Sequence, residues 1–275
     1  MAPGVLGADF SGAAEAGRSI WVTEAAHTPD GLVVEDCYRA TEKWGSDRES
    51  AHAGLRARAV GDFAVAGFDF PFSLPASLLE ARCGRSWRGL LDWVTDDGPD
   101  DPDAFASACR SVARELTPDG SAEIGRETDL RRAALCPYNR RVQYQTFYGV
   151  RNVLAWLADR DDALVRPMQQ GDGARSGGAG TGAADDATKV VEVYPAATFG
   201  WLGLYREGYK TDRDRRETNL DGIEDCSVDL GGFRETYADE HDALDSLAAA
   251  VSAGRVTRNR DPPLHGPREE GHIFV

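Results

Sequence analysis

Phe63-Ala-Val-Ala-Gly-Phe-Asp69 is the stretch that decides the fold, because six uncharged residues run into a single aspartate and Pro71 follows. An apolar run of this length, stopped by a proline, is typical of a buried strand. A second run of the same kind opens the chain, where Val5-Leu-Gly-Ala8 leads into Asp9. Strands of this type need cover on at least one face, so we predict a mixed α/β sheet flanked by helices.

The residues around these two runs predict an antiparallel meander that precedes the decisive strand. Three short apolar segments are expected to be strands joined by hairpin-like turns, at residues 4–10, 18–23 and 31–38. Ser46 or Asp47 is placed to cap a helix that reaches about Ala59. The strand at 63–69 then follows as the fourth of the sheet.

Beyond Pro71 the pattern changes, and we expect residues 71–160 to form a mostly helical insertion. It ends in an amphipathic helix from Gln145 to about Asp159. Residues 170–187 are rich in Gly and Ala and are predicted to be a flexible loop inside one sheet domain, which we take to comprise residues 1–275.

Three further elements are expected after the loop. The apolar run from Lys189 to Tyr194 predicts a strand, and Glu235 to about Gly254 predicts a long helix. The final residues, 271–275, read as a last short strand. No internal repeat is visible.

The composition constrains the environment more than the partner. The net charge is −15, from 31 basic and 46 acidic residues, and only Lys43, Lys189 and Lys210 are lysines. An acidic, lysine-poor surface suits a salt-rich cytoplasm, where screening shortens the Debye length to about 3 Å at roughly 1 M. We therefore expect a halophilic source, although a GC-rich genome also favours Arg over Lys. An acidic total normally argues against nucleic acid, but in a halophile a local basic patch can coexist with it.

Cysteine usage and hydropathy predict a soluble, cytoplasmic protein. The five cysteines contain no Cys-x-x-Cys pair and are expected to be reduced, buried thiols. No targeting signal is recognised near Met1, and no apolar run approaches the roughly 18 residues of a membrane helix.

Four aspartates are the candidate catalytic residues, because each is the lone charge, or nearly so, in a stretch that otherwise resembles core. They are Asp9, Asp69 and the pair Asp242 and Asp245. An ionised carboxylate in such a place is costly unless a cation pairs with it, and a divalent metal is the usual partner for several. Asp242 and Asp245 are spaced to lie on one helix face. We predict that the four bind Mg²⁺ or Mn²⁺.

Each candidate also has an ordinary structural interpretation. Asp9 and Asp69 could each cap a turn, and the helical pair could face water. The small residues on the stripe of the pair favour close packing against another element instead. Glu192, inside the strand at 189–194, is a possible fifth metal ligand; its alternative is a sheet carboxylate paired with an arginine. His241 could assist proton transfer or simply lie on the helix surface.

Basic residues in two segments are candidates for binding substrate phosphates. The candidates are Arg131, Arg140, Lys210 and Arg216. Ordinary ion pairing on an acidic protein is the alternative for each of them.

Several short motifs occur in an order that resembles the family called domain of unknown function 429. They are Gly7-Ala-Asp-Phe-Ser-Gly12, Gly67-Phe-Asp-Phe-Pro-Phe-Ser73, Glu192-Val-Tyr-Pro195, Tyr209-Lys210 and His241-Asp-Ala-Leu-Asp-Ser-Leu-Ala248. The resemblance implies a ribonuclease H-like fold and a predicted nuclease activity. It also implies that Asp9 and Asp69 match the aspartates of the first and fourth strands, and that Asp242 and Asp245 match the acidic helix of such enzymes.

The function expected from these features is a nuclease that hydrolyses phosphodiester bonds of DNA or RNA with two Mg²⁺ or Mn²⁺ ions. Two other functions stay open at this point. One is a nucleotide-binding phosphotransferase of the actin and sugar-kinase kind, in which Asp9 would hold Mg-nucleotide. The other is a binding module that keeps the fold without catalysis.

Overall fold

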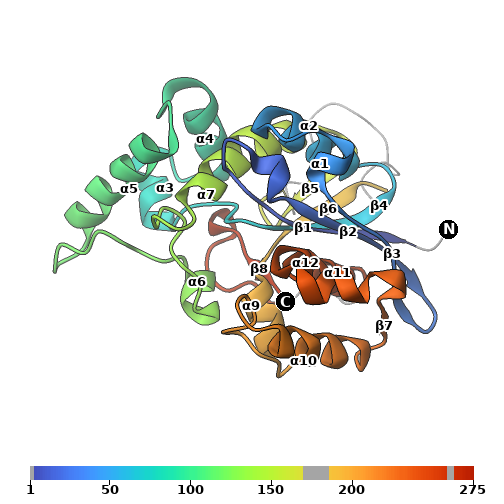
Figure 1. Ribbon diagram of the computed structural model, residues 1–275. Coiled ribbons are helices and arrows are strands. Elements are labelled where there is room, and N and C mark those ends of the chain that lie inside the picture. Colours follow the sequence, from blue (N-terminus) through green and yellow to red (C-terminus); the bar gives the residue numbers. More distant parts are fainter. Residues whose placement is uncertain (1–2, 170–185, 259–262) are drawn as a thin grey trace.

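The computed structural model describes residues 3–169, 186–258 and 263–275 (Figure 1). Its centre is a mixed sheet in the order β5-β6-β4-β1-β2-β3-β7, and β8 pairs with β6 off this path. The strands are β1 (Gly4–Asp9), β2 (Trp21–Thr28), β3 (Gly31–Arg39), β4 (Phe63–Asp69), β5 (Ala163–Arg166), β6 (Thr188–Val193), β7 (Val228–Asp229) and β8 (Ile273–Phe274).

The pairing directions give the sheet a ribonuclease H-like topology. Strands β1, β2 and β3 form the predicted antiparallel meander. Strand β4 adds to β1 in parallel, and β6 and β5 continue the parallel half. The prediction of fold class is therefore confirmed, and β4 has the predicted bounds.

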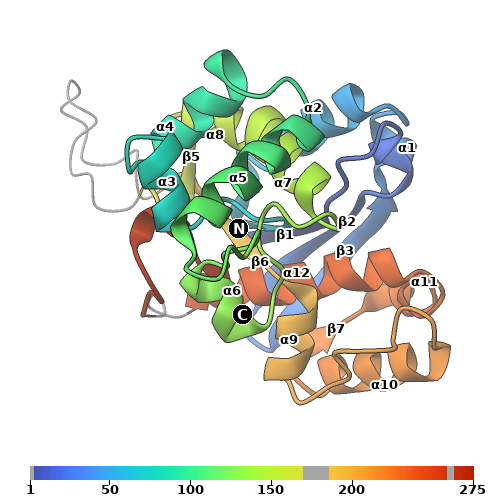
Figure 2. The same ribbon diagram turned by 90° about the vertical axis from the view of Figure 1, so that its left-hand side faces the viewer.

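Helices cover both faces of the sheet (Figures 1 and 2). On one face lie α1 (Ala40–Lys43), α2 (Arg48–Arg58), α3 (Ala76–Arg82), α4 (Trp87–Asp92), α5 (Pro102–Leu116), α7 (Gln143–Gly149) and α8 (Ala155–Ala158). On the other lie α9 (Pro195–Trp201), α10 (Arg213–Glu224), α11 (Arg234–Asp239) and α12 (His241–Arg258). Helix α6 (Glu127–Arg132) lies beside α9 in both views. Single turns are η1 (Ala16–Arg18), η2 (Trp93–Asp97), η3 (Val150–Leu154), η4 (Gly231–Phe233) and η5 (Arg268–Glu270).

Strand alternation divides the apolar residues between two cores. Leu6 and Phe68 belong to the core beneath the helical insertion. Val5 and Val65 belong to the core beneath α12. Because successive side chains point to opposite faces, the parity of a residue in β1 or β4 decides which core it enters. By the same parity, Asp9 points toward α12.

Two strand glycines allow α12 to approach the sheet closely. A Cβ on Gly7 would lie 2.1 Å from the backbone nitrogen of Ala250, and a Cβ on Gly67 would lie 3.0 Å from the carbonyl oxygen of Ala249. Helix α12 is correspondingly lined by small residues that are fully buried, including Ala249. The prediction that this helix packs close against another element is confirmed, and the close approach brings Asp245 up to the sheet.

Several predicted boundaries are corrected. The connection between β1 and β2 is no tight hairpin at Ser11-Gly12 but a longer loop that contains η1, so β2 begins only at Trp21. The predicted helix from Glu235 to Gly254 is two helices, because Glu240 adopts an extended conformation between α11 and α12. The helix expected from Gln145 is likewise interrupted, by the π-helical turn η3.

The remaining predictions about organisation have mixed outcomes. Asp47 caps α2 by accepting a hydrogen bond from the Ser50 backbone, as expected. Residues 71–160 contain helices and no strand within this fully described segment. Of the loop predicted at 170–187, residues 170–185 lie outside the described part. Four of the cysteines are buried thiols, but Cys226 is exposed, which corrects the expectation for that residue. None of the described helices is long and apolar enough to cross a membrane.

Candidate functional site

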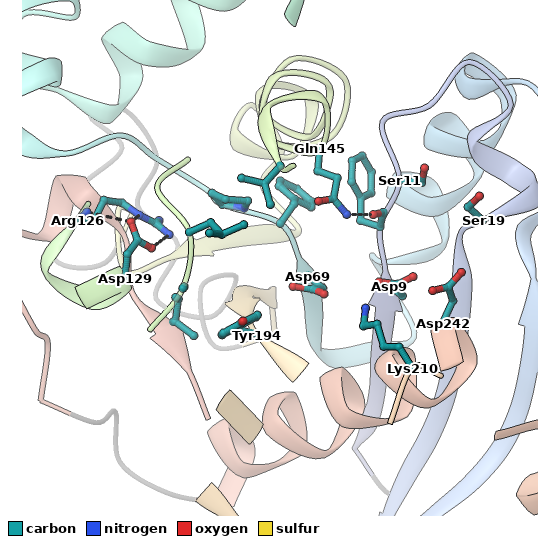
Figure 3. A pocket seen from close by; sticks show the side chains of 17 residues that line it. Asp9, Ser11, Ser19, Asp69, Arg126, Asp129, Gln145, Tyr194, Lys210 and Asp242 are labelled. Atoms are coloured by element: carbon teal, nitrogen blue, oxygen red, sulfur yellow. Dashed lines mark hydrogen bonds and ion pairs between the residues drawn. The ribbon is translucent and has the colours of Figure 1, made fainter. Parts of the chain in front are cut away.

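A pocket of about 320 Å³ opens at the carboxyl ends of β1 and β4 (Figure 3). Its polar lining comes from the sheet, the β1–β2 loop, the helical insertion and the C-terminal half of the chain. These polar residues are Asp9, Ser11, Ser19, Arg126, Asp129, Asp69, Gln145, Tyr194, Lys210 and Asp242. The pocket therefore lies at the end of the sheet where α/β folds commonly bind ligands.

Asp9 and Asp69 are direct neighbours in this pocket. They are paired in the register of the parallel strands β1 and β4. Neighbouring strands are about 4.8 Å apart, and residues in register point to the same face. The two carboxylates therefore stand side by side on the face that α12 covers, as the sequence predicted.

Helix α12 supplies the other two predicted carboxylates from the opposite direction. Asp242 lines the pocket, and about a third of its side chain (32%) is exposed. Asp245 lies one turn deeper and is buried. Electrostatic repulsion from both of them reaches Asp9. The structure thus brings all four predicted aspartates together.

Lys210 is the cation of this carboxylate group. Its Nζ lies 2.7 Å from Oδ2 of Asp245, and its side chain is 53% exposed, so that only the tip is drawn inward. In Figure 3 the ammonium group points toward Asp9. Tyr209 donates a hydrogen bond of 2.7 Å to the other oxygen of Asp245. The consecutive residues Tyr209 and Lys210 together hold Asp245 in place.

Burial and mutual repulsion raise the pKa values of three acids of this site, Asp9, Asp69 and Asp245. The pKa of Asp9 is raised well above its usual value, first by desolvation and then by the charges of Asp245 and Asp69. The pKa of Asp69 is also raised, first by desolvation and then by the charge of Asp245. Desolvation also raises the pKa of Asp245, although Lys210 opposes the effect. One ammonium group does not compensate several clustered carboxylates, so the site favours an additional cation.

The chemistry of the donor set fits a hard divalent cation. Carboxylate oxygens are the ligands that Mg²⁺ and Mn²⁺ prefer. Oδ2 of Asp245 is buried and, although close to Lys210, has no partner in hydrogen-bond geometry in the described part of the chain. Within the described residues, however, no three His, Cys, Asp or Glu side chains are positioned to hold a metal ion. Binding of a metal would therefore require the side chains around Lys210 to rearrange.

Glu192 does not join the four aspartates. It is buried on β6, next to Phe68 in register, and therefore points to the face opposite to that of Asp69. There it accepts hydrogen bonds of 2.7 and 2.5 Å from the guanidinium group of Arg126. It also accepts one of 2.9 Å from the Phe72 backbone. The arginine-paired alternative describes Glu192, and its assignment as a metal ligand is corrected.

The four residues predicted to bind phosphate lie in different environments. Lys210 lines the pocket. Arg216 is buried and donates to the backbone carbonyls of Ala238 and Tyr209, so it supports the segment that carries Lys210 and does not reach a ligand. Arg131 is exposed and pairs with Glu127. Arg140 is exposed and does not line the pocket.

Some residues of the site had no role assigned from the sequence. Gln145 reaches from α7 and donates to the carbonyl of Phe10, which ties the insertion to the end of β1. Ser19 and Tyr194 also line the pocket. Tyr194 belongs to the motif Glu192-Val-Tyr-Pro195 and Tyr209 to the motif Tyr209-Lys210, so the sequence contained a signal for both tyrosines. No pattern in the sequence singled out Ser19 or Gln145. His241 lies 3.1 Å from Asp242 at the start of α12 and is partly exposed.

A comparison with protein families gives one match, to the family described as "Protein of unknown function (DUF429)", over residues 19–270. The chain belongs to this family. The matched part of this DUF429 protein contains Asp69, Lys210, Asp242 and Asp245, whereas Asp9 precedes it. No curated protein and no solved structure matches the chain.

Proposed function

We propose that this DUF429 protein is a metal-dependent hydrolase that cleaves phosphodiester bonds of nucleic acid. The observation that carries the proposal is the in-register pair of Asp9 and Asp69, which share one pocket with Asp242 and lie within electrostatic reach of the buried Asp245. A cluster of acids at the carboxyl ends of the strands, in which Asp9, Asp69 and Asp245 have raised pKa values, is the kind of environment in which enzymes hold divalent ions. The ribonuclease H-like topology supports this reaction class by analogy.

Asp9, Asp69 and Asp245 are the residues that would hold the metal, with Asp242 at the edge of the site. A bound Mg²⁺ or Mn²⁺ would supply Lewis acidity and a water of lowered pKa. The exposed stem of Lys210 leaves its ammonium group free to move from Asp245 toward the open pocket. There it is the lining cation best placed to pair with a substrate phosphate.

Tyr209 and Gln145 have supporting roles in this proposal. The hydroxyl of Tyr209 keeps Asp245 oriented while Lys210 moves. Burial and the nearby Asp245 raise the pKa of Tyr209, so it remains a neutral donor at neutral pH. Gln145 fixes the backbone at Phe10, next to Asp9, and thereby limits the movement of the β1–β2 loop at the mouth of the pocket.

The test is cleavage of labelled DNA and RNA, single-stranded, duplex and branched, by purified protein with Mn²⁺ or Mg²⁺. We expect cleavage of at least one substrate, and we expect Asp9→Asn to abolish it. Asp225→Asn is the matched control, because Asp225 is exposed at the end of α10, outside the pocket. Cleavage that survives Asp9→Asn would contradict the proposal.

Calorimetric titration with Mn²⁺ separates metal binding from turnover. We expect saturable binding to the native protein and to Asp225→Asn. Binding should be weakened in Asp9→Asn by about tenfold or more, since each tenfold corresponds to about 1.4 kcal/mol and one charged ligand is removed. Equal Mn²⁺ affinity in all three proteins would show that the carboxylates are not the metal site.

A further inference from the structure

Three buried nitrogen atoms near the pocket have no hydrogen-bond partner among the residues that the structure describes. They are Nε of Arg132, Nη1 of Arg255 and Nε2 of His272. Arg132 ends α6, Arg255 lies near the end of α12, and His272 immediately precedes β8. Buried donors are normally paired, so three orphaned nitrogens in one region indicate a missing acceptor.

The charge of Arg132 acts on both Arg255 and His272, and we call these three residues the Arg132 cluster. The guanidinium carbon of Arg255 lies 3.3 Å from the ring centroid of Trp201 on α9. Arg206, just after α9, donates to the backbone carbonyl of Arg132. In both overall views α6 and α9 lie side by side (Figures 1 and 2). Helix α6, which ends at Arg132, therefore lies beside α9, whose Trp201 contacts Arg255.

No carboxylate of the described residues neutralises this cluster. Neither Arg132 nor Arg255 forms an ion pair there, whereas the neighbouring Arg131 pairs with Glu127. Both arginines are only partly buried. In a chain with a net charge of −15, two partly buried cations without a carboxylate partner are unexpected.

His272 contributes a neutral donor. The backbone N–H of His265 approaches Nδ1 of His272 at 3.5 Å, which assigns the ring proton to Nε2. Burial, followed by the nearby His265 and Arg132, lowers the pKa of His272 to about 4, so the ring is neutral at pH 7. Its Nε2–H is fully buried and is one of the three orphaned groups.

The electrostatics of the cluster favour an anion. Burial and then the charge of Arg132 lower the pKa of Arg255. Burial and then Arg131 lower the pKa of Arg132 itself. Such repulsion between cations is relieved by an oxyanion, which accepts charge-assisted hydrogen bonds from guanidinium groups.

The Arg132 cluster adjoins the carboxylate pocket. Ala134 and Leu135, which follow α6, line that pocket, and so does Ile273, the neighbour of His272. We propose that Arg132, Arg255 and His272 bind a phosphate group of the nucleic-acid substrate beside the carboxylate site. This inference rests on the proposed function for the identity of the ligand. The phosphate is either an internal phosphodiester or a terminal phosphomonoester.

The test measures binding without cleavage, in EDTA, with three probes. These are inorganic phosphate and a fluorescent single-stranded oligonucleotide with or without a 5′-phosphate. We expect Arg132→Gln and Arg255→Gln each to weaken binding of phosphate and oligonucleotide by about tenfold, the loss of one charge-assisted hydrogen bond. Each variant should also lower the slope of log affinity against log salt by about one. Arg114→Gln, on the exposed side of α5, is the control.

The outcomes separate the two phosphate sources and the two proposals. A loss confined to the 5′-phosphorylated strand identifies a terminal phosphate, and an equal loss for both strands identifies an internal one; either supports the site. Unchanged affinity and salt slope in both folded variants would overturn it. Phosphate binding with no oligonucleotide binding would overturn the assignment to substrate. Oligonucleotide binding that depends on the cluster, in a protein that cleaves nothing with Mn²⁺, would support this site and contradict the proposed hydrolase.

Discussion

Lys210 and Asp245 form an ion pair between a half-exposed cation and a buried anion. The Nζ to Oδ2 distance is 2.7 Å, and the exposed fractions of the two side chains are 53% and 1%. Because the two side chains differ in exposure, the lysine can move away from the pair into solvent, whereas the aspartate cannot. Lys210 therefore occupies the position of a removable counter-ion for the buried carboxylates.

Replacing Lys210 by methionine tests this relationship. Lys210→Met keeps the length of the side chain and removes its charge, which leaves Asp245 buried without a cation. We expect the metal-free protein to lose on the order of 1 kcal/mol of stability at neutral pH, a small value because the lysine is half exposed. Mn²⁺ should then raise the melting temperature by more than in the native protein, since it no longer competes with an ammonium group. Thermal unfolding in EDTA and in Mn²⁺ measures both effects.

Lys43→Met is the matched control. Lys43 forms an equally short ion pair with Asp36, but both side chains are exposed and neither lines the pocket. Its loss should leave the response to Mn²⁺ unchanged. A smaller Mn²⁺ stabilisation in Lys210→Met than in the native protein would show that Lys210 assists metal binding, contrary to the expectation.

The raised acid pKa values predict an unusual dependence of stability on pH. Because the pKa of Asp9 is higher in the folded protein than in the unfolded chain, the folded state takes up a proton first as the pH falls. The destabilisation from Asp9 is complete above its folded pKa. It disappears as the pH falls from that value toward the unfolded pKa near 3.9. Asp69 acts in the same direction.

Asp9→Asn isolates this contribution from the rest of the protein. In EDTA at neutral pH we expect the variant to be more stable than the native protein by about 0.5–2 kcal/mol, the usual range for relieving strain at a functional site. The advantage should vanish as the pH approaches the unfolded pKa. Urea unfolding of both proteins between about pH 4 and pH 8 supplies the comparison. A variant that is less stable at neutral pH would mean that Asp9 is stabilised by its surroundings.

The sequence predicts this architecture well where local pattern determines it. The run Phe63–Asp69 is a strand with the predicted bounds, because an apolar segment ended by Pro71 has few alternatives. The facing of Glu192 is a different case. Val191 and Val193 belong to the core beneath α12, so Glu192 between them faces the other way. Val190, on the same face as Glu192, is equally apolar, so period-two alternation alone does not say which face of this strand meets α12.

What the sequence does not reveal depends on contacts between distant segments. The approach of Lys210 to Asp245 joins a loop to a helix 35 positions later, and no local pattern encodes it. The break at Glu240 is equally hidden, because residues on both sides favour a helix. Arg216 resembled a phosphate-binding residue because its charge is visible in the sequence, whereas its burial is not.

Gly7→Ala tests the close approach of α12 to the sheet. The added Cβ would meet the backbone of Ala250 at 2.1 Å and that of Ser246 at 2.4 Å, so the helix itself has to move. Overpacking of this kind costs about 1–3 kcal/mol or more. The displacement should also weaken Mn²⁺ binding, because the same helix carries Asp245. Gly232→Ala is the control, since its Cβ would meet nothing within 4 Å. Equal stability of the two variants would contradict the packing.

Glu192→Gln distinguishes a structural carboxylate from a metal ligand. Its partner Arg126 is fully buried and also binds Asp129, so the substitution leaves a buried cation with one carboxylate fewer. We expect a loss of about 1.5–3 kcal/mol, the value of a hydrogen bond to a charged group, with Mn²⁺ affinity unchanged. Asp69→Asn, one position further along the neighbouring strand, should behave in the opposite way: its stability in EDTA rises and its Mn²⁺ affinity falls. Urea unfolding and Mn²⁺ titration of the two variants distinguish a structural carboxylate from a metal ligand. A loss of Mn²⁺ affinity in Glu192→Gln would show that Glu192 is a metal ligand after all.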